Sequence, residues 1–417
     1  MKIRKSVLEN QRIVKTILSL FCISIVTCVY AQDKWTQKAV FGGSGRYAAV
    51  GFSIADKGYI GTGYTLTDGN TQDLWEWNQL NNTWTQKANF PGAGRNQAAA
   101  FSIGKKGYIG TGYAGGIYTN DFWEWDQVSN TWSQIAPFAG TARCGAVAFS
   151  IGSKGYVGTG NDGSEKSDFW EWDQASNSWS KKADCGGGGR FTAVGFSIKN
   201  KGYIGTGAQG LTLLKDFWEW DQAKNTWIQK ADFPGLPRHM AVGFSIGTKG
   251  FIGTGRNAPN YYLQDLWQWD QLSNTWTSKA NFIGSGRNQA AGFAIGNKGY
   301  IGTGNDGGMG KDLWEYDSGI ISGITEMNSK SGQEAEINVY PNPANNQDII
   351  IHYNLPGSQK SELLIMDLQG KQIKSYLLEP ENNQIKISNG VMASGVYIYR
   401  IKTGNEIITS GKIIIAL

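Results

Sequence analysis

Six arginines are the side chains whose type and spacing most readily suggest ligand chemistry. Each stands 13 residues before the aromatic residue of a KGYIGTG-like motif, and the six are Arg46, Arg95, Arg143, Arg190, Arg238 and Arg287. A guanidinium presents five N–H donors in a fixed fork and binds carboxylates and similar acceptors at two points. Either the arginines ring one mouth of a channel as ligand contacts, or each pairs with a neighbouring turn. The repetition favours pairing, because few ligands have six-fold symmetry.

Tyrosines in loops of variable length are the second set of candidate ligand contacts. The interval from the KGYIGTG aromatic to the next tryptophan varies between 14 and 16 residues, whereas the other intervals in the repeat are constant. The variable loops are residues 64–72, 113–120, 161–167, 208–215, 256–264 and 305–311. Their candidate contacts are Tyr113, Tyr118, Tyr261 and Tyr262. Binding residues concentrate on such loops, although solvated loop tips with incidental aromatics are the alternative.

Residues for metal or phosphate chemistry are scarce. The chain has two histidines, and only His239 lies outside the C-terminal segment that contains His352. A single histidine does not assemble a metal centre, so we expect no metal and no cofactor. The GTG triplets each end a predicted strand with no helix after it, which excludes phosphate-binding loops. Carboxylate pairs are too unconstrained to name a general acid and base, so no catalytic residue is assigned.

The candidate residues belong to a unit that occurs six times, with a period of roughly 45 to 50 residues. KGYIGTG begins at Lys57, and its copies begin at Lys106, Lys154, Lys201, Lys249 and Lys298. Each copy predicts four short strands: a small apolar run such as 48–54, then KGYIG, DLWEWNQ and TWTQKA, with Gly, Asn and Asp-rich turns between them. Four antiparallel strands per unit are typical of a propeller blade.

The repeat resembles that of the kelch propellers. The shared features are an arginine before the inner strand, a Tyr-Gly strand end, an aromatic third strand and a tryptophan in the fourth. Thr62 and its five equivalents stand where the family has its first glycine, which is a departure from the founding pattern. The repeats look more like those of secreted kelch proteins of Bacteroidetes-type bacteria, which resemble galactose oxidase-like propellers without their chemistry. The resemblance implies an all-β, six-bladed β-propeller over residues 32–318.

The N-terminal strand is expected to close the ring. The sixth copy stops after residues 312–316 and lacks its tryptophan strand. Trp35 lies 11 residues before Arg46, the spacing that each internal fourth strand keeps to the next arginine. Residues 34–39 should therefore complete the sixth blade, which leaves no open edge between the first and the last blade.

Residues 1–31 are predicted to be a secretory signal peptide. They contain five basic residues, an apolar run over 17–29 and the ending VYA. The remaining chain has a net charge of +1, which argues against a nucleic-acid partner. No later stretch is long and apolar enough to span a membrane, and we expect a monomer. Cys144 and Cys185 either form a disulfide or remain as two free buried thiols.

The C-terminal segment differs in composition from the repeats. Residues 319–336 are expected to be a linker, and 337–417 predict about seven strands of a small β-sandwich. The segments NVYPNP, SGVYIYR and GKIII resemble the type A C-terminal sorting domain of the type IX secretion system. That resemblance implies the type IX machinery as a partner, passage across the outer membrane, and a secreted or cell-surface location.

Two functions fit these features. The first is a non-catalytic binding or interaction module that presents its variable-loop face to a glycan or protein. The second is a metal-free carbohydrate-active enzyme similar to the kelch sialic-acid mutarotase, with Arg238, His239 and Asp232 as its polar groups. Near-identity of the repeats argues against the enzyme, because catalysis needs an asymmetric site. A copper radical sugar oxidase needs two histidines at its centre, which the repeats do not supply.

Overall fold

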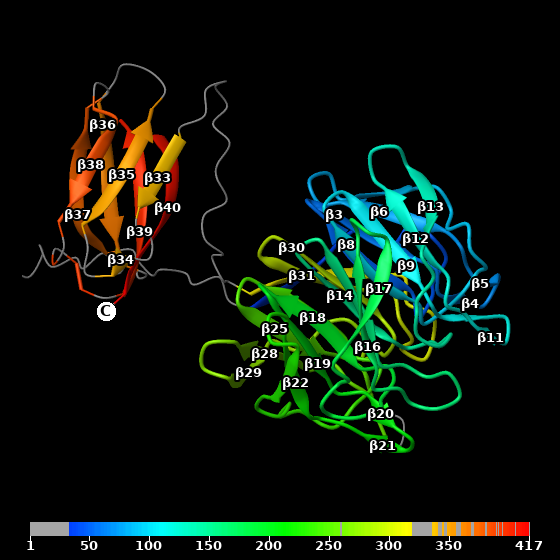
Figure 1. Ribbon diagram of the computed structural model, residues 1–417. Helices are drawn as coiled ribbons and strands as arrows, with labels where there is room; N and C mark the ends of the chain where they lie inside the picture. Colours follow the sequence, from blue (N-terminus) through cyan, green and yellow to red (C-terminus); the bar gives the residue numbers. More distant parts are fainter. Residues whose placement is uncertain are drawn as a thin grey trace, which may run out of the picture.

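A computed structural model describes residues 33–258, 261–318 and 336–416, the last range with gaps at 341–343, 346–347, 356–359, 368–370, 380–381, 389, 391, 394 and 405. The described residues form strands and turns and contain no helix (Figure 1). The predicted signal peptide at 1–31 and residues 319–335 of the predicted linker lie outside the described residues.

Residues 33–318, apart from 259 and 260, form six four-stranded antiparallel sheets, numbered here in the order of their inner strands. The inner strands are β2 (Val50–Ile54), β8 (Ala99–Ile103), β14 (Val147–Ile151), β18 (Val194–Ile198), β24 (Val242–Ile246) and β30 (Ala291–Ile295). The second strands are β3 (Lys57–Gly61), β9 (Lys106–Gly110), β15 (Lys154–Gly158), β19 (Lys201–Gly205), β25 (Lys249–Gly253) and β31 (Lys298–Gly302). The third strands are β6 (Leu74–Asn78), β12 (Phe122–Asp126), β16 (Phe169–Asp173), β22 (Phe217–Asp221), β28 (Leu266–Asp270) and β32 (Leu313–Asp317). The fourth strands are β7 (Thr83–Gln86), β13 (Thr131–Ile135), β17 (Ser178–Lys182), β23 (Thr226–Gln229), β29 (Thr275–Lys279) and β1 (Lys34–Gln37).

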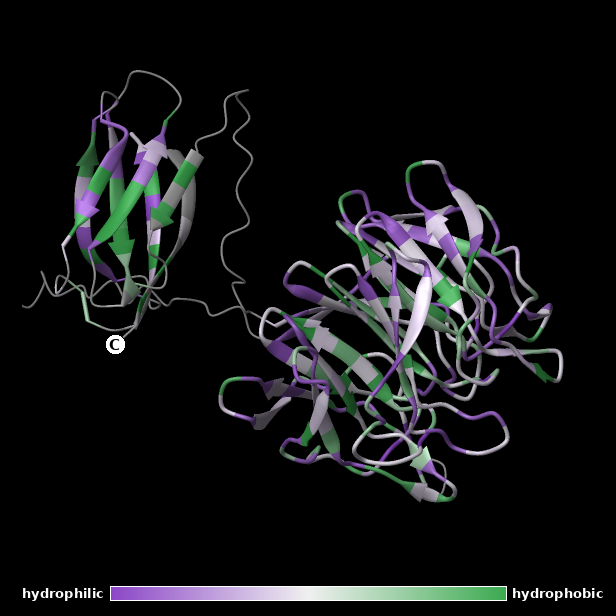
Figure 2. Ribbon diagram, in the orientation of Figure 1, coloured by the Kyte–Doolittle hydropathy of each residue, from purple (hydrophilic) through white to green (hydrophobic). Residues whose placement is uncertain are grey.

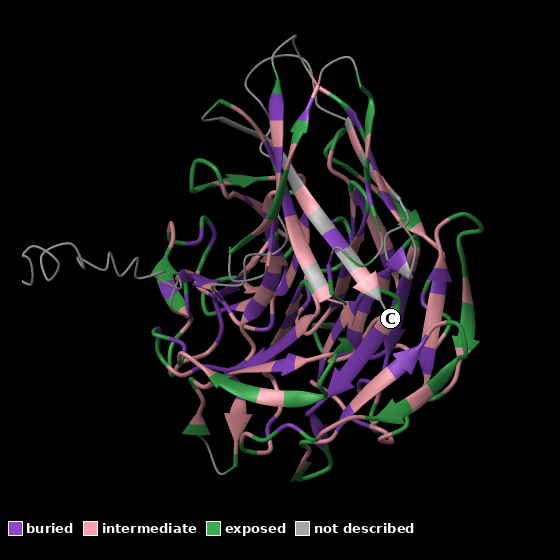
Figure 3. Cartoon of the chain, turned by 90° about the vertical axis from the view of Figure 1, so that its left-hand side faces the viewer, coloured by how far each residue is buried: buried purple, intermediate pink, exposed green. Residues whose placement is uncertain are grey.

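The glycine of each KGY motif is required by close packing between neighbouring sheets. A Cβ atom at Gly107 would lie 2.5 Å from the ring of Phe52, which belongs to the preceding sheet. The same contact recurs around the molecule and ends with Phe293 of the sixth sheet over Gly58 of the first. Hydrophobic residues are spread along the strands, where most of the buried ones lie, and further buried phenylalanines such as Phe41 and Phe90 lie in the connecting segments (Figures 2 and 3). The sheets therefore pack face to face through interlocking aromatic and glycine positions.

Backbone hydrogen bonds join the six sheets in a closed circle. The second residue after each arginine donates its N–H to the carbonyl of the equivalent residue in the preceding sheet, as from Gln97 to Ala48 at 3.0 Å. The circle closes where Ala48 N–H donates to Gln289 O at 2.8 Å. In a second circle the last glycine of each GTG triplet donates to the arginine carbonyl of the next sheet, and Gly304 donates to Arg46 O at 2.7 Å. Each inner strand accordingly lies against two others, with β30 against β2.

The N-terminal strand completes the sixth sheet. β1 pairs with β32 in antiparallel register, with Trp35 opposite Tyr316. Trp35 is buried, and its Nε1–H donates to Ala280 O at 3.0 Å. Each fourth-strand tryptophan of the other sheets makes the same bond, for example Trp84 to Ala39 O. The position that the 11-residue spacing predicted for Trp35 is therefore confirmed by the strand pairing.

A buried tyrosine–carboxylate pair links sheets, and the fifth repeat replaces it as a unit. Tyr203 donates its hydroxyl hydrogen to Glu219, and Gln271 of the next sheet donates to the Tyr203 oxygen at 2.8 Å. In the fifth sheet phenylalanine replaces the tyrosine and glutamine replaces the glutamate, at Phe251 and Gln268, which pair across β25 and β28. A buried carboxylate that loses its tyrosine donor is costly, so the two replacements occur together.

Four of the six variable loops form short hairpins that sequence patterns did not predict. They are β4 (Tyr64–Thr65) with β5 (Gly69–Asn70), β10 (Tyr113–Ala114) with β11 (Ile117–Tyr118), β20 (Ala208–Gln209) with β21 (Thr212–Leu213), and β26 (Arg256–Asn257) with β27 (Tyr261–Tyr262). The loops of the third and sixth sheets instead close with a single bridge each, Asn161 to Glu165 and Asn305 to Met309.

The C-terminal part forms two sheets around one core. One sheet contains β33 (Glu336–Tyr340), β35 (Ile349–Asn354) and β38 (Gln384–Ile387). The other contains β34 (Ala344–Asn345), β40 (Glu406–Ala416), β39 (Gly395–Thr403), β36 (Ser361–Met366) and β37 (Gln372–Leu378). Ile351 of the first sheet and Leu363 and Ile401 of the second are fully buried in one cluster. Two sheets that share such a core are the arrangement that the strand pattern of this segment predicted.

Candidate functional site

The six arginines lie beneath the loop face and are occupied by the protein itself. Arg46 is 1% exposed, and its Nη1 and Nη2 donate to the two carboxylate oxygens of Asp73 at 2.6 and 2.7 Å. Nη1 also donates to Thr62 O, and Nε donates to Ser44 O. The equivalent pairs are Arg95–Asp121, Arg143–Asp168, Arg190–Asp216, Arg238–Asp265 and Arg287–Asp312. These contacts match the pairing alternative, since each guanidinium is buried and bound to an aspartate.

The arginine pairs control the ionisation of their carboxylates. Burial alone would raise the pKa of Asp73, but the Arg46 guanidinium and the surrounding hydrogen bonds outweigh it and hold the pKa below its ordinary value. The same balance lowers the pKa of Asp121, Asp168 and Asp312. These carboxylates are therefore ionised partners of a cation, and they are unsuited to act as general acids near neutral pH.

The fourth repeat alters the contact beneath its arginine. A phenylalanine ring lies under five of the guanidinium groups, as Phe41 does under Arg46 at 4.9 Å. Cys185 occupies that position next to Arg190, whose Nε has no hydrogen-bond partner. Cys185 and Cys144 are both free thiols, so the disulfide alternative is excluded. Burial raises the pKa of the Cys185 thiol, and burial raises that of Cys144 to about 11.

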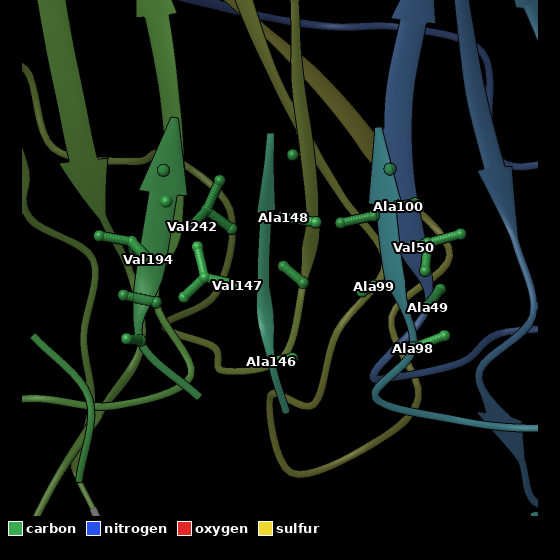
Figure 4. Close-up of a pocket in the computed structure, with 18 residues that line it drawn as sticks. Ala49, Val50, Ala98, Ala99, Ala100, Ala146, Val147, Ala148, Val194 and Val242 are labelled. Atoms are coloured by element: carbon green, nitrogen blue, oxygen red, sulfur yellow. The ribbon is translucent and has the colours of Figure 1, made fainter. Parts of the chain in front are cut away.

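Three adjoining cavities lie between the inner strands. The middle one has a volume of about 160 Å³ and is lined by alanine, valine and glycine from all six inner strands (Figure 4). The side chains that line it carry hydrocarbon only, so the lining offers no acid, base or nucleophile. A cavity of about 230 Å³ adjoins it at the end lined by Phe52, Ser53 and their equivalents. The third cavity, of about 110 Å³, opens at the arginine end.

At the arginine end of these cavities, the side chains differ between repeats. In every repeat, two residues separate the arginine from a constant alanine that leads into the inner strand. The first, on the rim, is Tyr47, Asn96, Cys144, Phe191, His239 or Asn288. The second, which lines the 110 Å³ cavity, is Ala48, Gln97, Gly145, Thr192, Met240 or Gln289. We call these twelve residues the mouth ring.

The backbone of the mouth ring has an unfavourable conformation at the residues that form the closed circle of hydrogen bonds. All six second positions have positive φ between 50° and 61°, and only Gly145 is a glycine. Such φ values are unfavourable for residues with a side chain, and most of all for the β-branched Thr192. This conformation accompanies the closed circle of backbone hydrogen bonds described above. The side chains at these positions are therefore held on a rigid ring.

Each first position of the mouth ring pairs with the first residue of the adjacent variable loop. The pairs are Tyr47–Tyr64, Asn96–Tyr113, Cys144–Asn161, Phe191–Ala208, His239–Arg256 and Asn288–Asn305. The rings of Tyr47 and Tyr64 stack at 5.4 Å. Asn288 is 2% exposed, and its Oδ1 has no hydrogen-bond partner among the residues that the structure describes. The channel mouth thus has aromatic, amide and cationic groups in an arrangement without six-fold symmetry, although the second and sixth repeats share the pair Asn-Gln. The only signal in the sequence was the variation directly after each constant arginine.

The candidate tyrosines lie in two hairpins next to this ring. Tyr113 and Tyr118 pair with each other across β10 and β11, while Tyr262 pairs with Arg256 across β26 and β27. Tyr118 donates to Asn161 Oδ1 at 3.3 Å, and Tyr262 donates to Asn305 Oδ1 at 3.2 Å. Tyr261 is 65% exposed at a hairpin end. The structure therefore divides the four tyrosines between two separate parts of the loop face.

The residues considered for mutarotase chemistry are not assembled. Arg238 pairs with Asp265, and Asp232 accepts a hydrogen bond from Gln229. Burial, together with the charge of Arg256, lowers the pKa of His239, which favours a neutral imidazole. In the part of the chain that the structure describes, no three His, Cys, Asp or Glu side chains gather in a group that could hold a metal ion.

Residues 338–416 match the family of secretion system C-terminal sorting domains. The match covers the two C-terminal sheets, and it supports export by type IX secretion as a secreted or surface protein. A search among curated proteins finds no match to the chain. Among the described residues, no helix has the length and apolar character needed to cross a membrane.

Proposed function

We propose that residues 32–318 are a six-bladed kelch-type β-propeller that acts as a non-catalytic binding module for a glycan or a protein. The observation that carries this proposal is the contrast at the channel mouth. The mouth ring has five different residue pairs in six repeats, only Asn96-Gln97 and Asn288-Gln289 being alike, whereas the arginine–aspartate pairs beneath it recur in all six. A surface that varies on a repeated frame is where recognition of an asymmetric ligand is expected.

The chemistry of the mouth supports a glycan more than a charged ligand. Asn96, Gln97 and Gln289 each offer amide donors and acceptors, which match the hydroxyl groups of a sugar. Tyr47, Tyr64 and Tyr113 add rings whose faces can cover the apolar C–H face of a pyranose. The channel behind the mouth is lined by hydrocarbon and is small, so a ligand would rest on the mouth rather than enter the molecule.

The proposed route to the outside combines both ends of the chain. Residues 1–31 would direct entry into the periplasm as a signal peptide, and the sorting domain at 338–416 would direct type IX export of a monomer to the cell surface or medium. Deletion of residues 319–417 should leave the repeats folded but retain the protein in the periplasm, because the deleted part holds its own core. Cell fractionation tests this, and normal amounts of the truncated protein outside the cell would contradict it.

The binding proposal is tested with the mature chain, residues 32–417, on an array of glycans. We expect binding to a restricted set of glycans that is lost when Asn96 and Gln97 are replaced by alanine together. The matched control has alanine in place of the exposed Leu80 and Leu272. Both lie in turns between third and fourth strands, and this variant should bind as the wild type does. Absence of binding to every glycan, or equal loss in the control, would contradict recognition of glycans at the mouth.

A further inference from the structure

The variable loops differ in height above the mouth ring. Four of them form tall hairpins, and the loops of the third and sixth sheets are shorter. In the first and fifth sheets the first pair of the hairpin joins Tyr64 to Asn70 and Arg256 to Tyr262. In the third and sixth sheets the only pair joins Asn161 to Glu165 and Asn305 to Met309. The hairpins have one more pair than the short loops, and each strand residue adds about 3.3 Å of rise. The third and sixth loops therefore end closer to the ring than the other four.

The two short loops lie opposite each other. The circle of backbone hydrogen bonds fixes the order of the sheets around the channel, and it places two sheets on either side between the third and the sixth. The first and second hairpins consequently stand on one side of the line that joins the short loops. The fourth and fifth hairpins stand on the other side. The line itself passes over the channel mouth.

Hydrogen bonds give this arrangement an approximate two-fold symmetry. Tyr118 of the second hairpin donates to Asn161 in the third loop, and Tyr262 of the fifth hairpin donates to Asn305 in the sixth. On one side, Asn70 Nδ2 donates to Tyr113 O and so joins the first hairpin to the second. The tall hairpins carry exposed apolar residues at or near their tips, namely Leu66, Ile117, Leu211 and Tyr261.

Groups that could contact a ligand follow the line between the short loops. Asn161 and Asn305 lie at its two ends, and both already accept a tyrosine hydroxyl. Asn288 lies next to Asn305, and its buried Oδ1 has no partner among the described residues. Because Asn288 is buried, it acts on a ligand through Asn305, with which it pairs, and not by direct contact. The line therefore offers amide groups in succession and not a single enclosed pocket.

An extended peptide fits this line less well than a glycan does. Peptides that bind in extended form usually pair with free backbone N–H and C=O groups at a sheet edge. At the mouth the backbone groups of the second ring positions are used in the closed circle, and those of the first positions pair with the variable loops. The charges near the third loop are also paired, since Lys166 lies 2.9 Å from Asp162.

We infer that the ligand is a linear glycan that lies across the mouth, over the loop at 161–167 and the loop at 305–311, between the two pairs of hairpins. This inference rests on the proposed function and specifies its ligand class. A chain bound in this way leaves both of its ends free. Affinity should therefore depend on the number of sugar units between the two short loops and not on a terminal sugar.

The first test is a length series with the mature wild-type chain. The probes are linear oligosaccharides of glucose, xylose, mannose and a uronic acid, each from one to six units, measured by calorimetry. We expect the hexasaccharide of at least one series to bind at least about tenfold more tightly than its monosaccharide. Equal affinity of the two would contradict the linear inference while leaving glycan binding in place. No binding in any series would instead contradict recognition of a glycan at the mouth, the form of the proposed function on which the inference rests.

The second test lengthens one of the two short loops. Insertion of Asn-Gly between Gly163 and Ser164 gives the third loop the length of the first, and it should weaken hexasaccharide binding at least about tenfold. The same insertion between Thr67 and Asp68 lengthens a loop that is already tall, and it should change affinity less than about twofold. If the first variant fails to fold, insertion between Gly307 and Gly308 tests the opposite end. Equal effects of the short-loop and tall-loop insertions would overturn the inference.

Discussion

Each repeat contains two neighbouring residues that the structure treats in opposite ways, the arginine and the residue directly after it. Arg238 is fully buried and makes contacts that five other arginines also make. His239 is half-buried on the rim, and no other repeat has a histidine there. Repetition therefore marks the residues that hold the ring together, while differences one residue away mark the surface available for recognition. The predictions below test this division between the repeated frame and the mouth ring.

Acid should have the largest effect, because it acts on several repeated pairs at once. Asp73, Asp121, Asp168 and Asp312 have pKa values below the ordinary value in the folded protein. An unfolded aspartate has a pKa of about 3.9, so the pairs stabilise the fold above that pH and lose their contribution as the pH falls through the folded-state values. Urea midpoints should decline slightly from pH 7 to 5, because burial lowers the pKa of His239 in the folded protein, and should fall steeply below about pH 4. A midpoint that changes little down to pH 3 would contradict this.

Removal of one of the six arginines should lower the free energy of unfolding by one of the largest amounts expected for a single substitution. Arg95→Ala leaves Asp121 and the Thr111 carbonyl without their partner in a buried site. Loss of one member of such a pair typically costs about 3 to 5 kcal/mol. Denaturant unfolding measures the cost, with Arg256→Ala as a control, because Arg256 is in a variable loop and is not one of the six repeated arginines. Similar losses of unfolding free energy at the two positions would contradict the distinction between the repeated arginines and the variable loops.

The N-terminal strand belongs to the repeated frame, and Trp35 should behave accordingly. Trp35→Ala should destabilise the protein by about 3 to 5 kcal/mol, the usual range for emptying a buried large aromatic site. Trp132→Ala should have a similar effect, because Trp132 makes the equivalent hydrogen bond to Ala88 O. An unaltered urea midpoint for Trp35→Ala beside a large shift for Trp132→Ala would refute closure by the N-terminal strand.

The fifth repeat provides a natural control for the tyrosine–glutamate pairs. Tyr203→Phe removes the donor to Glu219 and should cost about 1 to 3 kcal/mol, because a buried carboxylate loses a hydrogen bond. Adding Glu219→Gln reproduces the Phe251 and Gln268 combination and should restore part of that loss. A double-mutant cycle measures the coupling. Strictly additive losses would show that the paired replacement in the fifth repeat is not compensation.

The predicted parts of the fold follow from side-chain patterns. Constant intervals between arginine, aromatic and tryptophan positions located the strands of each sheet, and the spacing of Trp35 located β1. The circle of hydrogen bonds at the second ring position was not predictable, because it depends on backbone conformation at five residues that are not glycine. The hairpins in the variable loops were missed for a similar reason, since two-residue strands leave no alternating pattern.

The candidate site was only partly predicted. The tyrosines were placed correctly in the variable loops, but the six arginines were candidates because of their chemistry alone, and burial removes them from the surface. The mouth ring was missed because its residues share no chemical type. What identifies them is the difference between repeats at a fixed position next to a constant residue.

Loop tyrosines should affect stability least. Tyr261→Ala together with Tyr262→Ala should change the free energy of unfolding by no more than about 1 kcal/mol in total, because Tyr261 is exposed and Tyr262 is only partly buried. The same variant should weaken hexasaccharide binding, since Tyr262 holds Asn305 in place. Unchanged affinity for a ligand that the wild type binds would exclude this hairpin from the binding face.

The most direct test of the division compares two neighbours, Arg287 and Asn288, with both stability and binding measured on each variant. Arg287→Lys keeps the charge but loses the two-point contact with Asp312, and should lower the urea midpoint clearly. Asn288→Ala removes an amide oxygen that has no partner among the described residues, and should lower the midpoint much less than Arg287→Lys while hexasaccharide affinity falls, because Asn288 supports Asn305. We therefore expect the substitution at position 287 to act mainly on stability and the substitution at position 288 to act mainly on binding. A lowered midpoint for Asn288→Ala with unchanged binding, or an unchanged midpoint for Arg287→Lys, would contradict this expectation.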